Sequence, residues 1–239
     1  MPTLQKLTGG FDLNDGNQRY RGLTFGSSRF FIAKRDFNFD VYRPSTGVLS
    51  STATLIGSLN VAAGNTYWAN RLWVVGVTNT KVYAIRPFAI IIDLEDSAKS
   101  FNLHSNNTAP RGITFGGNHF WVANGSRFVY KYTSAGVYVT FGGVTGITGG
   151  TRGIAYGDGH LWILTSTNVY KVTEAFDLVE TYPLPADITD PEGILYKDGK
   201  LWILNDDDGT NNFVGVYGFA VGDVEVEQKV AFKDSATVR

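Results

Sequence analysis

The sequence predicts an all-β protein, a five-bladed β-propeller whose blades each hold four antiparallel strands. The first observation is an aromatic residue that recurs at spacings of 40 to 48 residues. The second is a glycine nine residues before it and another aromatic six residues before it, in all five repeats. The third is an alternating apolar segment downstream in each repeat, with no helical period anywhere in the chain. A repeat of this length that holds only strands is typical of propeller blades.

The recurring aromatic marks the second strand of each repeat. Because neighbouring blades of a propeller pack face to face, we predict that these five residues form a structural core between blades. They are Phe31, Trp73, Trp121, Trp162 and Trp202. The preceding glycines are Gly22, Gly64, Gly112, Gly153 and Gly193, and the preceding aromatics are Phe25, Tyr67, Phe115, Tyr156 and Tyr196.

We expect one domain over residues 1–239, because the 28 glycines are spread along the chain rather than pooled in a linker. An N-terminal strand within residues 7–13 is expected to close the ring on the last blade. Since residues 224–232 alternate like one more strand, a six-bladed ring is the alternative. The repeats cover approximately residues 20–59, 60–105, 106–147, 148–188 and 189–232.

Composition narrows the classes of function. The net charge is −1, from 21 basic and 22 acidic residues, so no nucleic-acid partner is expected. Cysteine is absent, which excludes disulfides and thiolate metal sites. No apolar run has the length of a signal peptide or a membrane span, so we expect a soluble protein without membrane insertion. No cofactor is predicted, and the sequence does not indicate the compartment or the oligomeric state.

One repeat also resembles a known family of blades. Residues 111–124 read RGITFGGNHFWVAN, and residues 128–136 read FVYKYTSAG. This pattern is similar to the blades of the broad propeller superfamily that includes NHL-type and streptogramin-lyase-like proteins, and the similarity covers about residues 20–220. The resemblance implies the architecture and no single activity, since that superfamily includes lyases, lactonase-like hydrolases, protein-binding scaffolds and surface or virion adhesins.

The candidate ligand-binding site lies one residue before the repeat glycines. Arg21, Arg111 and Arg152 occupy this position in three repeats, Ala63 in another and Glu192 in the last. The first strand of a propeller blade starts beside the axis, so we expect these residues to circle the mouth of the central channel. Guanidinium groups bind carboxylate, sulfate or phosphate well, which predicts an anion site. The alternative is that each arginine caps carbonyl groups of neighbouring loops.

An acidic loop at residues 205–212 is expected on the same face. Asp206 and Asp208 resemble half of a calcium loop, but the glutamate expected at its twelfth position is absent. Aspartate, asparagine and glycine are also the ordinary residues of turns. We therefore interpret the loop as a solvated acidic hairpin and predict no metal site.

The leading functional hypothesis is a non-enzymatic recognition or structural module, on a surface or in a virion, whose protein or glycan partner binds the loop face. No catalytic motif or catalytic residue is recognised. One alternative is a glycan-binding lectin that uses exposed aromatics, for which Tyr20, Trp68 and Tyr182 are candidates. The other is a cation-dependent lyase or hydrolase at the axis, although His119 and His160 are expected on the opposite face.

Overall fold

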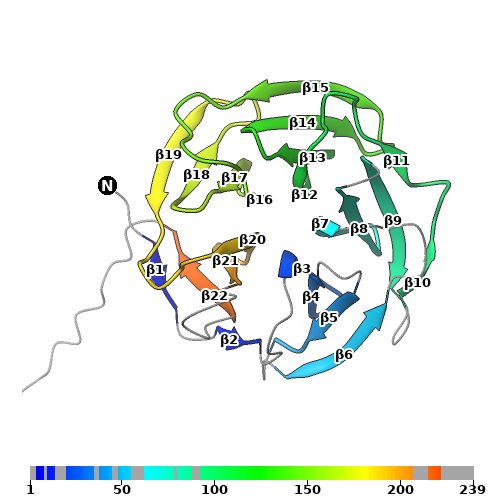
Figure 1. The fold of residues 1–239 in the computed structure, drawn as a ribbon, viewed down its shortest axis with the longest axis horizontal. Helices are drawn as coiled ribbons and strands as arrows, with labels where there is room; N and C mark the ends of the chain where they lie inside the picture. The colour runs from blue at the N-terminus through cyan, green and yellow to red at the C-terminus, as the bar shows by residue number, and fades with distance from the viewer. Residues whose placement is uncertain are drawn as a thin grey trace, which may run out of the picture.

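The computed structural model is a five-bladed β-propeller, as the sequence predicts, and the six-bladed alternative is wrong (Figure 1). None of the described residues lies in a helix, so the described part of the chain offers no helix that could cross a membrane. The structure describes residues 4–7, 10–13, 20–34, 38–44, 48–54, 62–77, 80–87, 92–206 and 215–221.

Blades 1 to 4 run in chain order from the axis outward (Figure 1). Blade 1 consists of β3 (Tyr20–Gly26), β4 (Arg29–Lys34), β5 (Asn38–Tyr42) and β6 (Leu49–Thr54). Blade 2 consists of β7 (Ala62–Trp68), β8 (Arg71–Gly76), β9 (Lys81–Pro87), β10 (Ile92–Glu95) and the short β11 (Phe101–Asn102). Blade 3 consists of β12 (Pro110–Gly116), β13 (His119–Asn124), β14 (Phe128–Thr133) and β15 (Tyr138–Gly143). Blade 4 consists of β16 (Gly153–Gly157), β17 (His160–Leu164), β18 (Asn168–Val172) and β19 (Leu178–Pro183).

Blade 5 joins the two ends of the described chain. It consists of β20 (Pro191–Lys197), β21 (Lys200–Asn205) and β22 (Gly215–Ala220), with β1 (Gln5–Lys6) and β2 (Phe11–Asp12) paired on the outer edge of β22. Gln5 pairs with Ala220, and Phe11 pairs with Val216. The N-terminal segment thus supplies two short strands where the sequence suggested one over residues 7–13. The possible strand over residues 224–232 lies outside the described residues.

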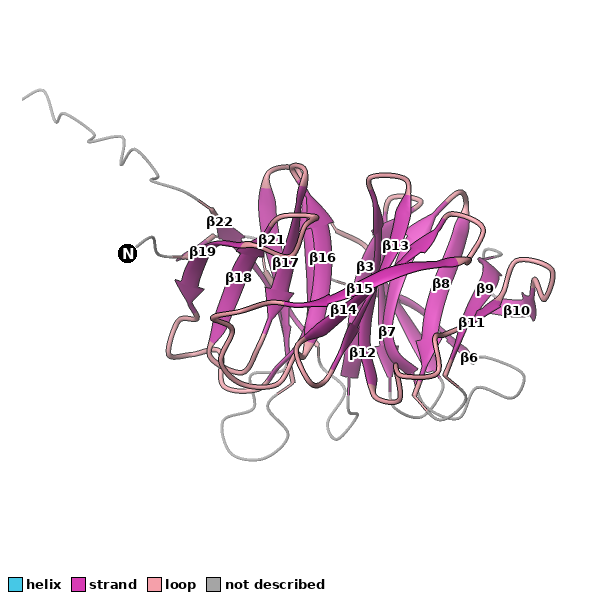
Figure 2. Cartoon of the chain, turned by 90° about the horizontal axis from the view of Figure 1, so that it is seen from above, coloured by secondary structure: helices cyan, strands magenta, loops and turns pink. Residues whose placement is uncertain are grey.

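The repeat glycines form a ring of backbone contacts around the axis. A Cβ atom on Gly64 would lie 2.7 Å from the Cα of Gly112, and one on Gly22 would lie 2.9 Å from the Cα of Gly64. Real Cβ atoms essentially never approach other atoms this closely. The glycine at this repeat position therefore lets the innermost strands of neighbouring blades come together, which sets the narrow bore of the channel. Figure 2 shows the ring from its side, with the strands crossing its thickness.

Replacing Gly64 with alanine should lower the free energy of unfolding by about 1–3 kcal/mol, because the new methyl group meets backbone that cannot rotate away. Gly153 is the matched control, since its Cβ would have its nearest neighbours at 3.3 Å. Urea unfolding of Gly64→Ala and Gly153→Ala, followed by tryptophan fluorescence, measures the difference. Equal losses in the two variants would contradict the crowding argument.

Four of the five recurring aromatics are buried between blades: Phe31 is 5% exposed, Trp73 2%, Trp121 0% and Trp162 1%. Three of the tryptophans, Trp73, Trp121 and Trp162, donate their indole N–H to a carbonyl oxygen five residues earlier, each at 3.1 Å. Trp202 is only half-buried, and its indole nitrogen has no hydrogen-bond partner among the described residues. Each of these buried indoles therefore packs between two blades and joins the second strand of its own blade to the end of the first strand.

Candidate functional site

The candidate site is the mouth of the central channel, which is lined by Arg21, Arg111 and Glu192 beside the glycine ring. The backbone itself presents these side chains. In four blades the residue before the ring glycine is the extra residue of a β-bulge, which interrupts the pairing of the first two strands. A bulge leaves its extra residue unpaired and re-aims its side chain. The sequence carries no distinct signal for these bulges.

Glu192 links two of the arginines across the mouth. Arg21 donates from Nη1 to Glu192 Oε2 at 3.1 Å, and Arg152 donates from Nη1 to Glu192 Oε1 at 2.7 Å. The Glu192 side chain is 1% exposed, against 16% for Arg21 and 34% for Arg152. Blade 5 lies between blades 1 and 4 in a closed ring, so one carboxylate reaches both neighbours. This pairing offsets the mutual repulsion of the two guanidinium groups.

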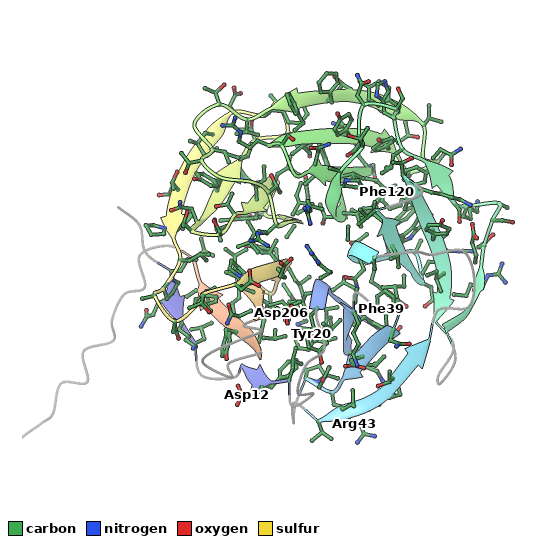
Figure 3. The ribbon with its side chains drawn as sticks, viewed as in Figure 1. Asp12, Tyr20, Phe39, Arg43, Phe120 and Asp206 are labelled. Atoms are coloured by element: carbon green, nitrogen blue, oxygen red, sulfur yellow. The ribbon has the colours of Figure 1, made fainter. Side chains whose placement is uncertain are left out.

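Further acidic groups lie on the blade 5 side of the mouth. Arg152 Nη2 also lies 3.6 Å from Asp190 Oδ1. Asp206 is 2% exposed and accepts a hydrogen bond from the backbone N–H of Tyr20 at 3.0 Å, and both residues are labelled in Figure 3. Asp206 thus joins blade 5 to blade 1. Asp208, the other carboxylate that was weighed as half of a calcium loop, lies outside the described residues.

Arg111 differs from the other two arginines. It lines the mouth from blade 3, and within the described part of the chain it makes no hydrogen bond and no ion pair. Its Nε lies 3.4 Å from the position that a Cβ on Gly125 would take. The glycine at the end of the second strand therefore leaves room for the guanidinium stem. Glu192 and Asp190 are thus paired with Arg21 and Arg152, whereas Arg111 has no acidic partner among the described residues.

The channel is narrow at the mouth and farther in. The residues after the ring glycines point into it: four are aliphatic and one, Asn65, is polar. Asn65 donates from Nδ2 to the carbonyl oxygen of Phe31 at 3.2 Å, and its Oδ1 has no partner among the described residues. The free space is about 10 Å³ at the mouth and 20 Å³ farther in, room for about one water molecule each. The aliphatic residues are Leu23, Ile113, Ile154 and Ile194.

The aromatics named for a lectin do not form an exposed platform. Tyr20 is 1% exposed and Tyr182 is 2% exposed. Trp68 is half-buried and stacks on Phe115, with 3.8 Å between the ring centroids. All three candidates are therefore packing residues.

The histidines do not reach the mouth. His119 and His160 begin the second strands of blades 3 and 4, at the turn on the opposite face, and each ring Nδ1 lies 2.6 Å from a backbone carbonyl oxygen two residues earlier. Across the described ranges, no three His, Asp or Glu side chains are arranged to hold a metal ion. The arrangement at the mouth is therefore one of fixed ion pairs and one unpaired guanidinium group.

Comparisons with known proteins find similarity in solved structures but not in sequence families. No protein-family model matches the sequence, and no curated protein matches it. Among solved structures, the chain is similar to the glutaminyl cyclase of Myxococcus xanthus, with a TM-score of 0.73 and 11% identity over 93% of this chain and 98% of that one. A luciferin-regenerating enzyme has a TM-score of 0.58 and 11% identity, covering 92% of this chain and 95% of the other.

A third similar structure is a nidogen/laminin complex, with a TM-score of 0.55 and 11% identity over 78% of this chain and 72% of the matched one. Likeness at this level of identity concerns the fold alone. The three structures include enzymes and a complex between proteins. The chain is therefore a five-bladed β-propeller, and its similarity to these proteins is one of fold.

Proposed function

We propose that the protein is a non-enzymatic recognition module that binds an acidic group of a partner at the channel mouth. The observation that carries the proposal is the contrast between Arg111 and its two counterparts. Arg21 and Arg152 are held by Glu192, whereas Arg111 lines the same opening without an ionic partner in the described residues. A guanidinium group in this position has its donors available for a carboxylate from outside.

The shape of the mouth favours a group that protrudes from a larger partner. The channel below has room for about one water molecule, so it does not enclose a small molecule in the way that ordinary ligand pockets do. A carboxylate at the tip of a side chain needs no deep pocket. It needs only to reach the guanidinium group at the surface.

The same geometry gives less support to catalysis. Glu192 is a buried carboxylate that lines the mouth, and each of its oxygens already accepts a hydrogen bond from an arginine. A carboxylate that bridges two arginines in this way is occupied by charge-assisted hydrogen bonds, which favours a positioning role over proton transfer. Two of the similar structures are enzymes, but an 11% likeness extends only to the fold. The resemblance of the repeats to NHL-type and streptogramin-lyase-like blades fits a surface or virion module as well as an enzyme.

The proposal is tested with a fluorescein-labelled tetraglutamate peptide, whose binding is followed by fluorescence anisotropy at low salt. We expect the wild-type protein to bind this probe and the Arg111→Gln variant to bind it about tenfold more weakly, equivalent to about 1.4 kcal/mol. Because Arg111 has no partner in the described residues, this change should leave the melting temperature unaltered. A tetraglutamine peptide of the same length measures binding that does not depend on charge.

The control variant is Arg43→Gln, which makes the same change in charge at an exposed position on the outer rim (Figure 3). It should bind the acidic probe as the wild type does, apart from a small effect of net charge. The proposal fails if the wild type does not bind the probe. It fails equally if Arg111→Gln and Arg43→Gln weaken binding to the same extent.

A further inference from the structure

Exposed apolar side chains gather on one sector of the ring. Of the nine large hydrophobic residues that are exposed in the described structure, seven belong to blades 3 and 4 or the turns beside their outer strands. The two others, Val48 and Leu49, lie in blade 1. Six of the seven form an apolar strip: Val137, Tyr138, Val139, Phe141, Leu178 and Val179.

The two halves of the apolar strip adjoin. The ring of Phe176, in the turn before β19, lies against Gly142 in β15, where a Cβ would come within 2.2 Å of it. Leu178 Cδ2 lies 3.0 Å from the position of a Cβ on Gly146. The start of the outer strand of blade 4 therefore packs beside the end of the outer strand of blade 3. The apolar strip is one surface that spans two blades.

The chemistry of this surface is unusual for the free edge of a sheet. Strand β15 pairs only with β14 and forms the outer edge of blade 3. From Ser134 to Thr151 the chain carries no charged residue. Native proteins commonly protect free edges with charged side chains, which discourage pairing with other chains. Blade 4 carries such a charge in Glu180, whereas blade 3 has none on its outer strand.

We propose that the apolar strip is an interface with a second copy of this chain, arranged around a two-fold axis. In such an interface the residues nearest the axis lie near their own counterparts, so we place the axis at the uncharged stretch of β15, where no like charges meet. The net charge of −1 adds little repulsion between two whole molecules. Aliphatic side chains such as Val139 and Val179, 46% and 50% exposed, suit an apolar protein surface better than a sugar.

Two positions in the apolar strip allow a sharp test. Val139 and Val179 are each skipped by the strand pairing, because each is the extra residue of a β-bulge at the start of its outer strand. A lysine there disturbs neither the ladder of hydrogen bonds nor the core. In the double variant Val139→Lys/Val179→Lys, two like charges from each copy would meet in the interface, which is strongly unfavourable.

Sedimentation velocity of the full chain, at concentrations from about 1 to 100 µM, measures the association. We expect the wild type to form a dimer of twice 26.1 kDa, and Val139→Lys/Val179→Lys to raise the dissociation constant at least about 100-fold. The matched control is Val48→Lys/Leu49→Lys, which places the same charges on exposed aliphatic residues of blade 1. This control should dimerise like the wild type. If the lysine variant of the strip melts early, Val139→Thr/Val179→Thr replaces it and should also weaken the dimer.

Several outcomes would overturn the proposal. A wild type that remains monomeric at the highest concentration leaves no dimer to explain. A dimer that survives both variants of the apolar strip uses another surface. Equal weakening by Val48→Lys/Leu49→Lys would reveal an effect of overall charge. Loss of the dimer on deletion of residues 222–239 would assign the contact to the C-terminal segment of the second copy.

Discussion

Replacing Trp121 with alanine should lower the free energy of unfolding by about 3–5 kcal/mol, the cost of emptying the space of a buried aromatic side chain. Trp121 is 0% exposed and packs with Ile154, Leu161 and Tyr170 in the core between blades 3 and 4. The change also removes the hydrogen bond from the indole to the carbonyl of Gly116. Urea unfolding followed by far-ultraviolet circular dichroism measures the loss without relying on tryptophan emission.

Trp202→Ala provides the comparison, because this tryptophan occupies the same repeat position but is half-buried and its indole N–H has no partner in the described chain. The decrease in the free energy of unfolding should be distinctly smaller for Trp202→Ala than for Trp121→Ala. A cost below about 1 kcal/mol for Trp121→Ala would mean that this side chain contributes little to the core.

Replacing Asp40 with alanine should also lower the free energy of unfolding by about 3–5 kcal/mol, because it leaves a buried charge without its counter-ion. Asp40 is 0% exposed and its Oδ2 lies 2.9 Å from the ammonium group of Lys34, which is 6% exposed. Tyr20 and Thr52 also donate hydrogen bonds to this carboxylate, at 3.2 and 2.7 Å. Removing the carboxylate leaves the ammonium group of Lys34 buried beside hydroxyl groups, without this counter-ion.

The double variant Lys34→Met/Asp40→Leu separates this cost from a loss of packing. Removing both charges of a buried pair is commonly far less harmful than removing one. We therefore expect the double variant to be more stable than Asp40→Ala when both are unfolded in urea. If the double variant is as unstable as Asp40→Ala, the loss of stability comes from losing the ion pair itself and not from leaving the charge of Lys34 without its partner.

The fold could be predicted because its constraints recur. A glycine such as Gly64 or Gly112 is needed where the innermost strands of two blades meet. A large aromatic residue such as Trp73 or Trp121 is needed where two blades pack. The same residue types therefore recur in each blade. The strands that close the ring do not recur in this way. Two-residue strands such as β1 carry too little pattern for their bounds to be read from sequence, and the fifth blade depends on them.

The candidate site could be predicted only in outline. The repeat position depends on the period alone, and two of its arginines, Arg21 and Arg111, line one opening, while Arg152 contacts Glu192 beside them. Which arginines form ion pairs depends on which of them the Glu192 side chain reaches. The direction of that side chain depends on a β-bulge that has no distinct signal in the sequence. Tyr20 was one candidate for a glycan contact, and it is instead buried in an apolar cluster that includes Leu204, a residue far away in the chain. The anion site itself stays a prediction.

The pairing of β1 and β2 with β22 also orders events in time. During synthesis, hairpins within blades 1 to 4 can form as soon as their own residues emerge, whereas blade 5 must wait for residues 215–220 to reach a segment that precedes all four other blades in the chain. Contacts between distant parts of a chain are slow to form. Until then the incomplete ring exposes the flanks of blades 1 and 4 that blade 5 will cover. The nascent protein is therefore most exposed to misassembly in the interval before the last strand arrives.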